Sequence, residues 1–99
     1  MKLVFIVFNI TLAEDVQKLL KGLEITCFTR IPRLEGVGLT AGARFDNSVW
    51  PGANSALIVV TSPTKAAELM TAVRQLRKDE GREGVKAFML NVEDMTGDI

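Results

Sequence analysis

The sequence of 99 residues contains no histidine, no tyrosine and a single cysteine. Histidine is the commonest general base and the commonest imidazole ligand, so we exclude histidine catalysis and expect no zinc or copper site. Cys27 has no second cysteine with which to form a disulfide within the chain. Because a nucleophile and its base cannot be assembled from these residues, we predict that the protein is not an enzyme.

The sequence also lacks an excess of charge of either sign. Its 12 basic and 12 acidic residues cancel, so we expect no general attraction to nucleic acid or to an anionic membrane. The longest apolar run, residues 3–8, is far shorter than the roughly 20 residues of a membrane-spanning helix. Because the chain starts without a signal-peptide pattern, we predict a cytoplasmic protein that is not embedded in a membrane.

Apolar residues, in contrast, are abundant. They make up 47% of the chain, with a mean hydropathy of +0.21, which is high for a small domain that must cover its own core. The length predicts a single domain over residues 1–99. We therefore expect part of the apolar surface to contact another subunit.

Four segments have the patterns of β-strands. Residues 3–8 and 56–60 are continuous apolar runs, which are typical of strands that are covered on both faces. Alternating side chains predict a strand over residues 25–31, limited by Pro32, and another apolar segment predicts a strand over residues 85–92.

Two segments have helical spacing. The first is predicted to begin at a capping box formed by Thr11 and Glu14 and to end at Gly22. The second is predicted to begin after Ser62 as the N-cap and to end at Gly81. Its buried stripe is expected to consist of Ala66, Leu69, Met70, Val73 and Leu76.

The order of these elements, βαββαβ, predicts an α+β ferredoxin-like plait. In this fold a four-stranded antiparallel sheet carries both helices on one face. The strands over residues 3–8 and 56–60 have no polar alternation, so the other face of the sheet would expose a large apolar patch. We therefore predict a homo-oligomer that packs through this face.

Residues 34–54 form a long connection without periodicity between two predicted strands. Phe45 and Trp50 lie within it, and aromatic residues are favoured anchors at protein interfaces. We predict that residues 39–54 dock on a target protein with Trp50 as the anchor. The alternative is that this loop folds onto the body of its own molecule.

Three segments in this order carry a family resemblance: residues 22–29 (GLEITCFT), 35–38 (EGVG) and 86–92 (KAFMLNV). Together with the order of elements they resemble the nitrogen regulatory PII signalling family over residues 1–92. The resemblance implies a homotrimer whose sheets line the middle, and a loop that docks on a target such as a transporter or an enzyme. It also implies clefts between subunits, where family members hold adenine nucleotides and oxoglutarate.

The resemblance implies candidate ligand-binding residues. Gly36 and Gly38 stand at the base of the long loop, and Lys86 stands where a phosphate-contacting lysine enters the last strand of family members. Independently of the resemblance, Arg30, Arg33, Arg82 and Lys86 lie at predicted strand ends near the two loops, where they could converge on a carboxylate or phosphate. The plainer interpretations are glycines that only let the chain turn and charges that are simply solvated.

Two departures from the family pattern affect the expected effector. The glycine- and aspartate-rich turn of the family is replaced by residues 80–85 (EGREGV), and its basic terminal strand by the acidic residues 93–98. We therefore expect classical ATP binding to be weak or absent. The sequence does not identify the effector, and a weakly bound adenine nucleotide or small anion is the candidate. The absence of tyrosine removes the usual site of uridylylation in the loop.

Other interpretations stay open from the sequence. An ACT-type regulatory domain that binds an amino acid shares the same plait, whereas an RNA-recognition plait would need aromatic residues in the strand at 56–60. Cys27 is predicted to be a buried packing residue rather than a redox sensor. Glu93, Asp94 and Asp98 are predicted to form an acidic tail rather than a cation site.

Overall fold

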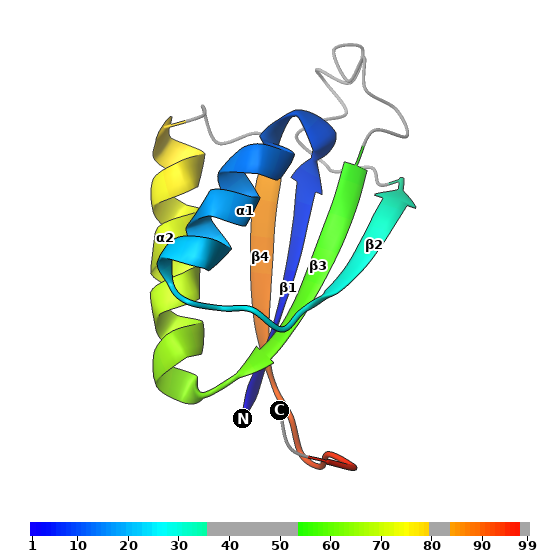
Figure 1. The fold of residues 1–99 in the computed structure, drawn as a ribbon, viewed down its shortest axis with the longest axis vertical. Helices are drawn as coiled ribbons and strands as arrows, with labels where there is room; N and C mark the ends of the chain where they lie inside the picture. The colour runs from blue at the N-terminus through cyan, green and yellow to red at the C-terminus, as the bar shows by residue number, and fades with distance from the viewer. Residues whose placement is uncertain (36–53, 80–83, 98–99) are drawn as a thin grey trace.

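The computed structural model describes residues 1–35, 54–79 and 84–97. In chain order the elements are β1 (Lys2–Asn9), the short 3-10 helix η1 (Ile10–Leu12), α1 (Ala13–Gly22), β2 (Thr29–Leu34), β3 (Asn54–Thr61), α2 (Pro63–Asp79) and β4 (Val85–Asn91). The strands form one antiparallel sheet in the order β2-β3-β1-β4. Both α-helices lie on the same side of this sheet (Figure 1). The predicted ferredoxin-like plait is therefore confirmed.

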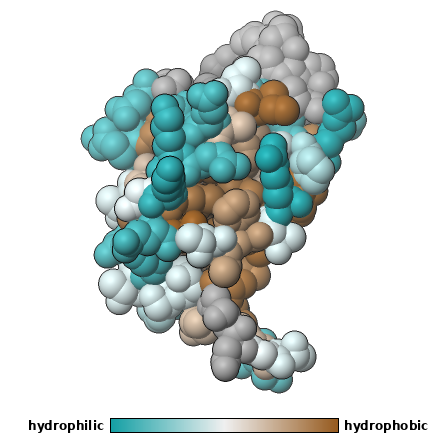
Figure 2. Space-filling view, viewed as in Figure 1, coloured by the Kyte–Doolittle hydropathy of each residue, from teal (hydrophilic) through white to brown (hydrophobic). Residues whose placement is uncertain are grey.

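The core lies between the sheet and the two helices. Along β1, burial alternates, and Val4, Ile6 and Phe8 are almost completely buried against the helices. Val16 and Leu20 of α1 pack into the same cluster. Seen from this side, charged and polar residues surround an apolar stretch of the surface (Figure 2).

The opposite side of the sheet has no helix. Side chains that are paired across antiparallel strands share a face, and the register therefore assigns a second set of residues to this side, which we call the open face. The open face consists of Leu3, Phe5 and Val7 of β1, Thr29 and Ile31 of β2, Ala56, Ile58 and Val60 of β3, and Lys86, Phe88 and Leu90 of β4. Within it the rings of Phe5 and Phe88 lie 6.5 Å apart between centroids. The open face is thus apolar except near its margins.

The predicted strand over residues 25–31 is wrong in its position, because β2 begins at Thr29. The preceding residues instead form a connection that crosses the helix side of the sheet (Figure 1). Ile25 is buried there as part of the core cluster, whereas Cys27 is exposed. The prediction of a buried Cys27 is therefore also wrong, since this residue lies in a surface connection and has no strand register.

Pro32 lies inside β2 and does not limit it, contrary to the prediction. The strand tolerates proline because β2 is at the edge of the sheet, where a missing N–H breaks no ladder. A register shift between Ile31 and Leu34 brackets this residue. The hydroxyl of Ser55, completely buried in β3, donates to the carbonyl of Pro32 at 2.7 Å and ties the irregular segment to its neighbour.

The first helix begins differently from the prediction. Asn9, rather than Thr11, caps the helical segment: its Oδ1 accepts hydrogen bonds from the backbone N–H of Thr11 at 2.9 Å and from the Thr11 hydroxyl at 2.6 Å. The N-cap of α1 is Leu12, which has no side-chain capping bond. The Thr11–Glu14 capping box is therefore wrong, because η1 precedes α1 and moves the first cap upstream.

The last helical residue of α1 is Gly22, as predicted, but the left-handed residue that follows the helix is Glu24, with φ 59°. The N–H of Glu24 donates to the carbonyl of Lys21, and the N–H of Ile25 to the carbonyl of Leu20, both at 2.9 Å. These two bonds form a Schellman motif.

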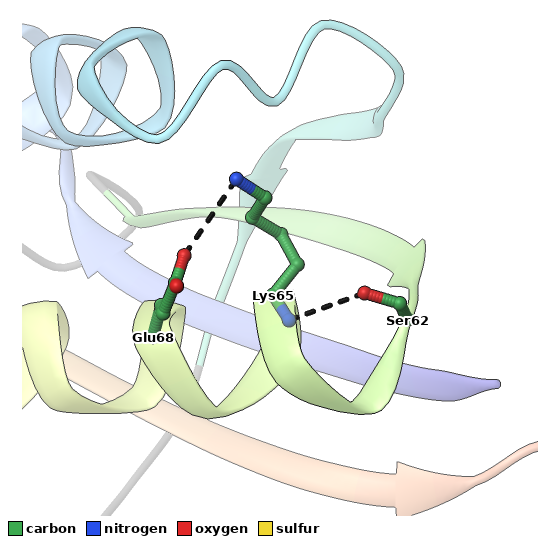
Figure 3. Close-up of polar contacts among 3 residues, drawn as sticks. All are labelled: Ser62, Lys65 and Glu68. Atoms are coloured by element: carbon green, nitrogen blue, oxygen red, sulfur yellow. Dashed lines mark hydrogen bonds and ion pairs between the residues drawn. The ribbon is translucent and has the colours of Figure 1, made fainter.

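The second helix follows the prediction closely. The backbone N–H of Lys65 donates to the hydroxyl of Ser62 at 3.2 Å, which confirms Ser62 as the cap, and the Lys65 ammonium lies 3.6 Å from the carboxylate of Glu68 (Figure 3). All five residues of the predicted stripe are buried or half-buried against the core. The helix is described as far as Asp79, and Gly81 lies outside the described residues.

Candidate functional site

Two of the residues that the sequence analysis selected, Arg33 and Lys86, lie at one end of the sheet. The strands β1 and β2 finish at this end, at Asn9 and Leu34, and β3 and β4 begin there, at Asn54 and Val85 (Figure 1). We call it the loop end of the sheet, because residues 36–53 lie between β2 and β3, and residues 80–83 between α2 and β4. Arg33 and Lys86 belong to this end.

Five of the predicted site residues lie outside the described part of the chain. They are Gly36, Gly38, Phe45, Trp50 and Arg82. Their roles stay predictions. Arg33 and Lys86 are described, and both side chains are exposed.

Lys86 lies at the loop end of the open face. Its cross-strand partner is Val7, and its ammonium lies 5.8 Å from the centroid of the Phe88 ring. An exposed cation over an aromatic ring gains only about 0.5–1 kcal/mol. The ammonium can therefore leave the ring for an anion at little cost.

Arg33 lies near the end of β2, within the irregular segment that Ser55 ties to β3. Because β2 and β4 are opposite edges of the sheet, three strand spacings, or about 14 Å, separate the strands that carry Arg33 and Lys86. The strands that carry these two residues are therefore the most widely separated pair in the sheet. The two residues share the loop end but are not brought together.

Arg30, another arginine of β2, is separated from Lys86 in a different way. Its cross-strand partner is Leu57, which lies on the helix side of the sheet, whereas Lys86 lies on the open face. The two cations therefore lie on opposite sides of the sheet.

The start of β4 is held by contacts that the sequence analysis missed. Gly84 has φ +92°, a conformation that strains residues with a side chain, and a Cβ at this position would lie only 3.1 Å from Cδ1 of Leu12. The backbone N–H of Asn9 donates to the carbonyl of Gly84 at 2.6 Å. On the other side, Nη1 of Arg77 donates to the carbonyl of Val85 at 2.5 Å. The sequence contained one indication of this contact: Arg77 is a basic residue at a position of α2 that faces the sheet.

Asn9 is the second missed residue. Its side chain is 1% exposed, and its Oδ1 is used by the two bonds from Thr11. Within the described part of the chain, its Nδ2 is the one buried side-chain polar atom that has no hydrogen-bond partner. No pattern of apolar residues could have indicated it.

Metal and membrane sites can be examined only for the part of the chain that is described. Residues 1–35, 54–79 and 84–97 contain no group of three or more histidine, cysteine or acidic side chains arranged to hold a metal ion. Within the same residues, no helix is both long and apolar enough to cross a bilayer.

Comparison with known proteins decides the family. The sequence profile of the family "Nitrogen regulatory protein P-II" matches residues 1–97. The chain belongs to this family. The predicted resemblance is confirmed over almost the whole P-II chain, and an ACT-type domain is not favoured. A comparison with curated proteins finds no match.

Solved structures of similar fold are PII-like proteins. A PII-like signalling protein of Thermus thermophilus is 25% identical, with a TM-score of 0.61, over 92% of this chain and 84% of that one. The nitrogen regulatory PII-like protein CPII of Thiomonas intermedia, bound to ADP, AMP and bicarbonate, is 18% identical, with a TM-score of 0.65, over 95% and 93% of the two chains. CPII bound to ADP, AMP and acetate is 14% identical, with a TM-score of 0.67, over 89% and 81%.

Proposed function

We propose that this P-II family chain is a cytoplasmic regulatory homotrimer that acts by binding rather than by catalysis. It binds a small effector, an adenine nucleotide or a small anion, in clefts between subunits. It docks on a target protein, such as a transporter or an enzyme, through residues 39–54. The observation that carries the proposal is the position of Arg33 and Lys86 at the same end but on opposite edges of the sheet.

The placement of the two cations favours a site that is shared between chains. A phosphate or carboxylate is held best by several charge-assisted hydrogen bonds, and Arg33 and Lys86 of one chain lie on opposite edges of the sheet. Where β2 of one subunit lies beside β4 of the next, Arg33 of one chain and Lys86 of the other come together at the loop end. A ring of such contacts brings the loop ends of neighbouring chains together.

The open face supports the assembly itself. Phe88 and Leu90 are 47% and 53% exposed, beside half-buried apolar residues of β1 and β3. A contiguous apolar surface of this kind is typical of an interface between subunits. Packing the open faces of several chains against one another removes this surface from water.

The choice of effector rests on relatives and on Lys86. Two structures of CPII contain ADP and AMP, together with bicarbonate or acetate, so both a nucleotide and a small anion are candidates for the cleft of this chain. Lys86 supplies a mobile cation for either ligand. The acidic residues 93–98 stand where the family pattern has a basic strand, and ATP, with its additional phosphate, is therefore expected to bind most weakly.

Two measurements test this proposal. Sedimentation equilibrium at micromolar concentration is expected to give a trimer, and a monodisperse monomer would contradict the shared cleft. Isothermal titration is expected to detect binding of ADP, AMP or bicarbonate that Lys86→Ala weakens. Lys65→Ala is the matched control, because Lys65 is a partly exposed lysine at the start of α2, away from the loop end. Equal binding by all three proteins would remove Lys86 from the site.

The docking part of the proposal is tested through Trp50, the single tryptophan of the chain. An exposed anchor is expected to emit red-shifted fluorescence that a soluble quencher reduces readily. A blue-shifted emission that resists quenching, together with a loss of stability in Trp50→Ala, would assign Trp50 to packing within the trimer. In that case residues 39–54 would lose their best candidate for contacting a partner.

A further inference from the structure

We propose that Arg77 is a positioning residue for the anion site, and that it acts through Lys86. The proposal rests on the proposed function, in which Lys86 contacts the effector. It adds a residue on the other side of the sheet, at the end of α2, which fixes where β4 begins. Three observations on the described residues lead to it.

The first observation is the place of Arg77 on its helix. The residues of α2 that face the sheet include Ala66, Leu69 and Val73, which are at most 3% exposed. The next position of this stripe, four residues after Val73, is Arg77, which is half-buried. A helix normally has an apolar residue at such a position. Because Arg77 is charged, its half-buried guanidinium needs a hydrogen-bond acceptor.

The second observation is the direction of the carbonyl that Arg77 contacts. Immediately before β4, the carbonyl of Gly84 accepts from the backbone N–H of Asn9 at the end of β1, so the backbone groups of Gly84 point toward β1. Directions alternate along a strand, and the carbonyl of Val85 therefore points to the outer edge, where the described chain places no further strand. Val85 is only 3% exposed, and a buried carbonyl requires a partner. The guanidinium of Arg77 is that partner, at 2.5 Å.

The third observation is that these two contacts hold consecutive peptide groups from opposite sides. Asn9 holds Gly84 from the inner side, and Arg77 holds Val85 from the outer side. The next residue is Lys86, and its position at the loop end of the open face follows from the register that these contacts fix. Without Arg77 the outer contact is lost, and the backbone that carries Lys86 becomes freer to move.

A double-mutant cycle with ADP as the probe tests the proposal. Arg77→Met keeps the aliphatic stem and removes the donors, and it is expected to weaken ADP binding to the full-length protein about tenfold in isothermal titration. Arg77→Lys, which keeps a positively charged N–H donor group on a shorter side chain, is expected to recover part of this loss. In a Lys86→Ala background, Arg77→Met is expected to cause no additional loss beyond about twofold, because its effect passes through Lys86.

Hydrogen exchange provides a readout that does not depend on the ligand. Arg77→Met is expected to speed amide exchange at residues 86 and 88, whose N–H groups point toward β1, while Arg74→Met, an exposed arginine one turn earlier on α2, leaves it unchanged. If Arg77→Met does not fold, Arg77→Lys replaces it in both experiments.

The outcomes separate the two proposals. Two results overturn the role of Arg77 and leave the proposed function intact. One is an unchanged ADP affinity in Arg77→Met. The other is that Arg77→Met weakens ADP binding equally in the wild-type and the Lys86→Ala protein. Binding of neither ADP nor bicarbonate by the wild-type protein overturns both, and faster exchange in Arg77→Met then assigns Arg77 to the fold alone.

Discussion

The two faces of the sheet are equally apolar but are covered in different ways. On the helix side, Val4, Ile6 and Phe8 of β1 are buried by α1 and α2. On the open face their neighbours Leu3 and Phe5 are only half-buried, and no element of the described chain covers them. Hydropathy therefore predicts that a strand is buried on both faces, but it cannot say whether its own chain or another copy provides the cover.

Strand β4 shows that exposure alone does not distinguish the two faces. Phe88, Met89 and Leu90 are 47%, 42% and 53% exposed. Their register separates them, because Phe88 and Leu90 pair with residues of the open face, whereas Met89 pairs with Val4 of the core side. Met89 and Leu90 are therefore a matched pair of adjacent residues, with which the helix side and the open face of the sheet can be compared.

The largest effect is expected where the helix side is most tightly packed. Leu69 of α2 is completely buried against the sheet, and Leu69→Ala is expected to lower the free energy of unfolding by about 2–5 kcal/mol, from lost burial and the cavity that remains. Urea unfolding at several protein concentrations measures this loss and separates it from association. A loss below about 1 kcal/mol would show that the helix layer is not the main source of stability.

The next effect concerns the open face. Leu90→Glu is expected to weaken self-association at least tenfold, because a buried carboxylate without a partner is costly at a subunit interface. Met89→Glu introduces the same charge on the neighbouring residue, on the other side of the strand, and is expected to leave the assembly intact. Sedimentation equilibrium compares the two variants. Equal behaviour would show that the open face is not the interface.

Much of this fold could be predicted because its strongest signals are local. Continuous apolar runs identified β1 and β3, and helical spacing with the Ser62 cap identified α2. The failures occurred where tertiary contacts override a local pattern. The alternation over residues 25–31 combined a connection that buries Ile25 with the first residues of an edge strand.

The site was less predictable than the fold. Lys86 was identified through its resemblance to a family motif, whereas Asn9 and Arg77 matter through single hydrogen bonds between elements that are distant in sequence. Such contacts leave no periodicity in a single sequence. The prediction that Arg33 and Lys86 converge required knowledge of the strand order, which places them on opposite edges.

A smaller effect is expected at the loop end, where Asn9 joins the sheet to the helix side. Asn9→Ala removes the acceptor for Thr11 and is expected to destabilise the fold by about 1 kcal/mol. Asn9→Asp keeps this acceptor and replaces the Nδ2 donor, which has no partner within the described residues, so it tests the cap separately. Thermal unfolding of both variants is the measurement. A larger loss in Asn9→Asp than in Asn9→Ala would mean that burying a carboxylate at this position costs more than the cap contributes.

The smallest effect is expected in the connection that lies over the helix side of the sheet. Glu24 adopts φ 59° at the left-handed position of the Schellman motif, a conformation that costs a residue with a Cβ roughly 1 kcal/mol and costs glycine almost nothing. Glu24→Gly removes this backbone strain, but part of the benefit is lost because glycine is more flexible in the unfolded chain. We therefore expect stabilisation by about 0.5 kcal/mol. Gly22→Ala is the matched control: no atom lies within 4 Å of the added Cβ, and alanine is favoured inside a helix by about 0.5–1 kcal/mol. Both variants are expected to raise the unfolding midpoint without changing self-association, because neither residue belongs to the open face. If Glu24→Gly destabilises the protein while Gly22→Ala stabilises it, the Glu24 side chain makes a contribution that outweighs its backbone strain, and the connection depends on more than its backbone hydrogen bonds.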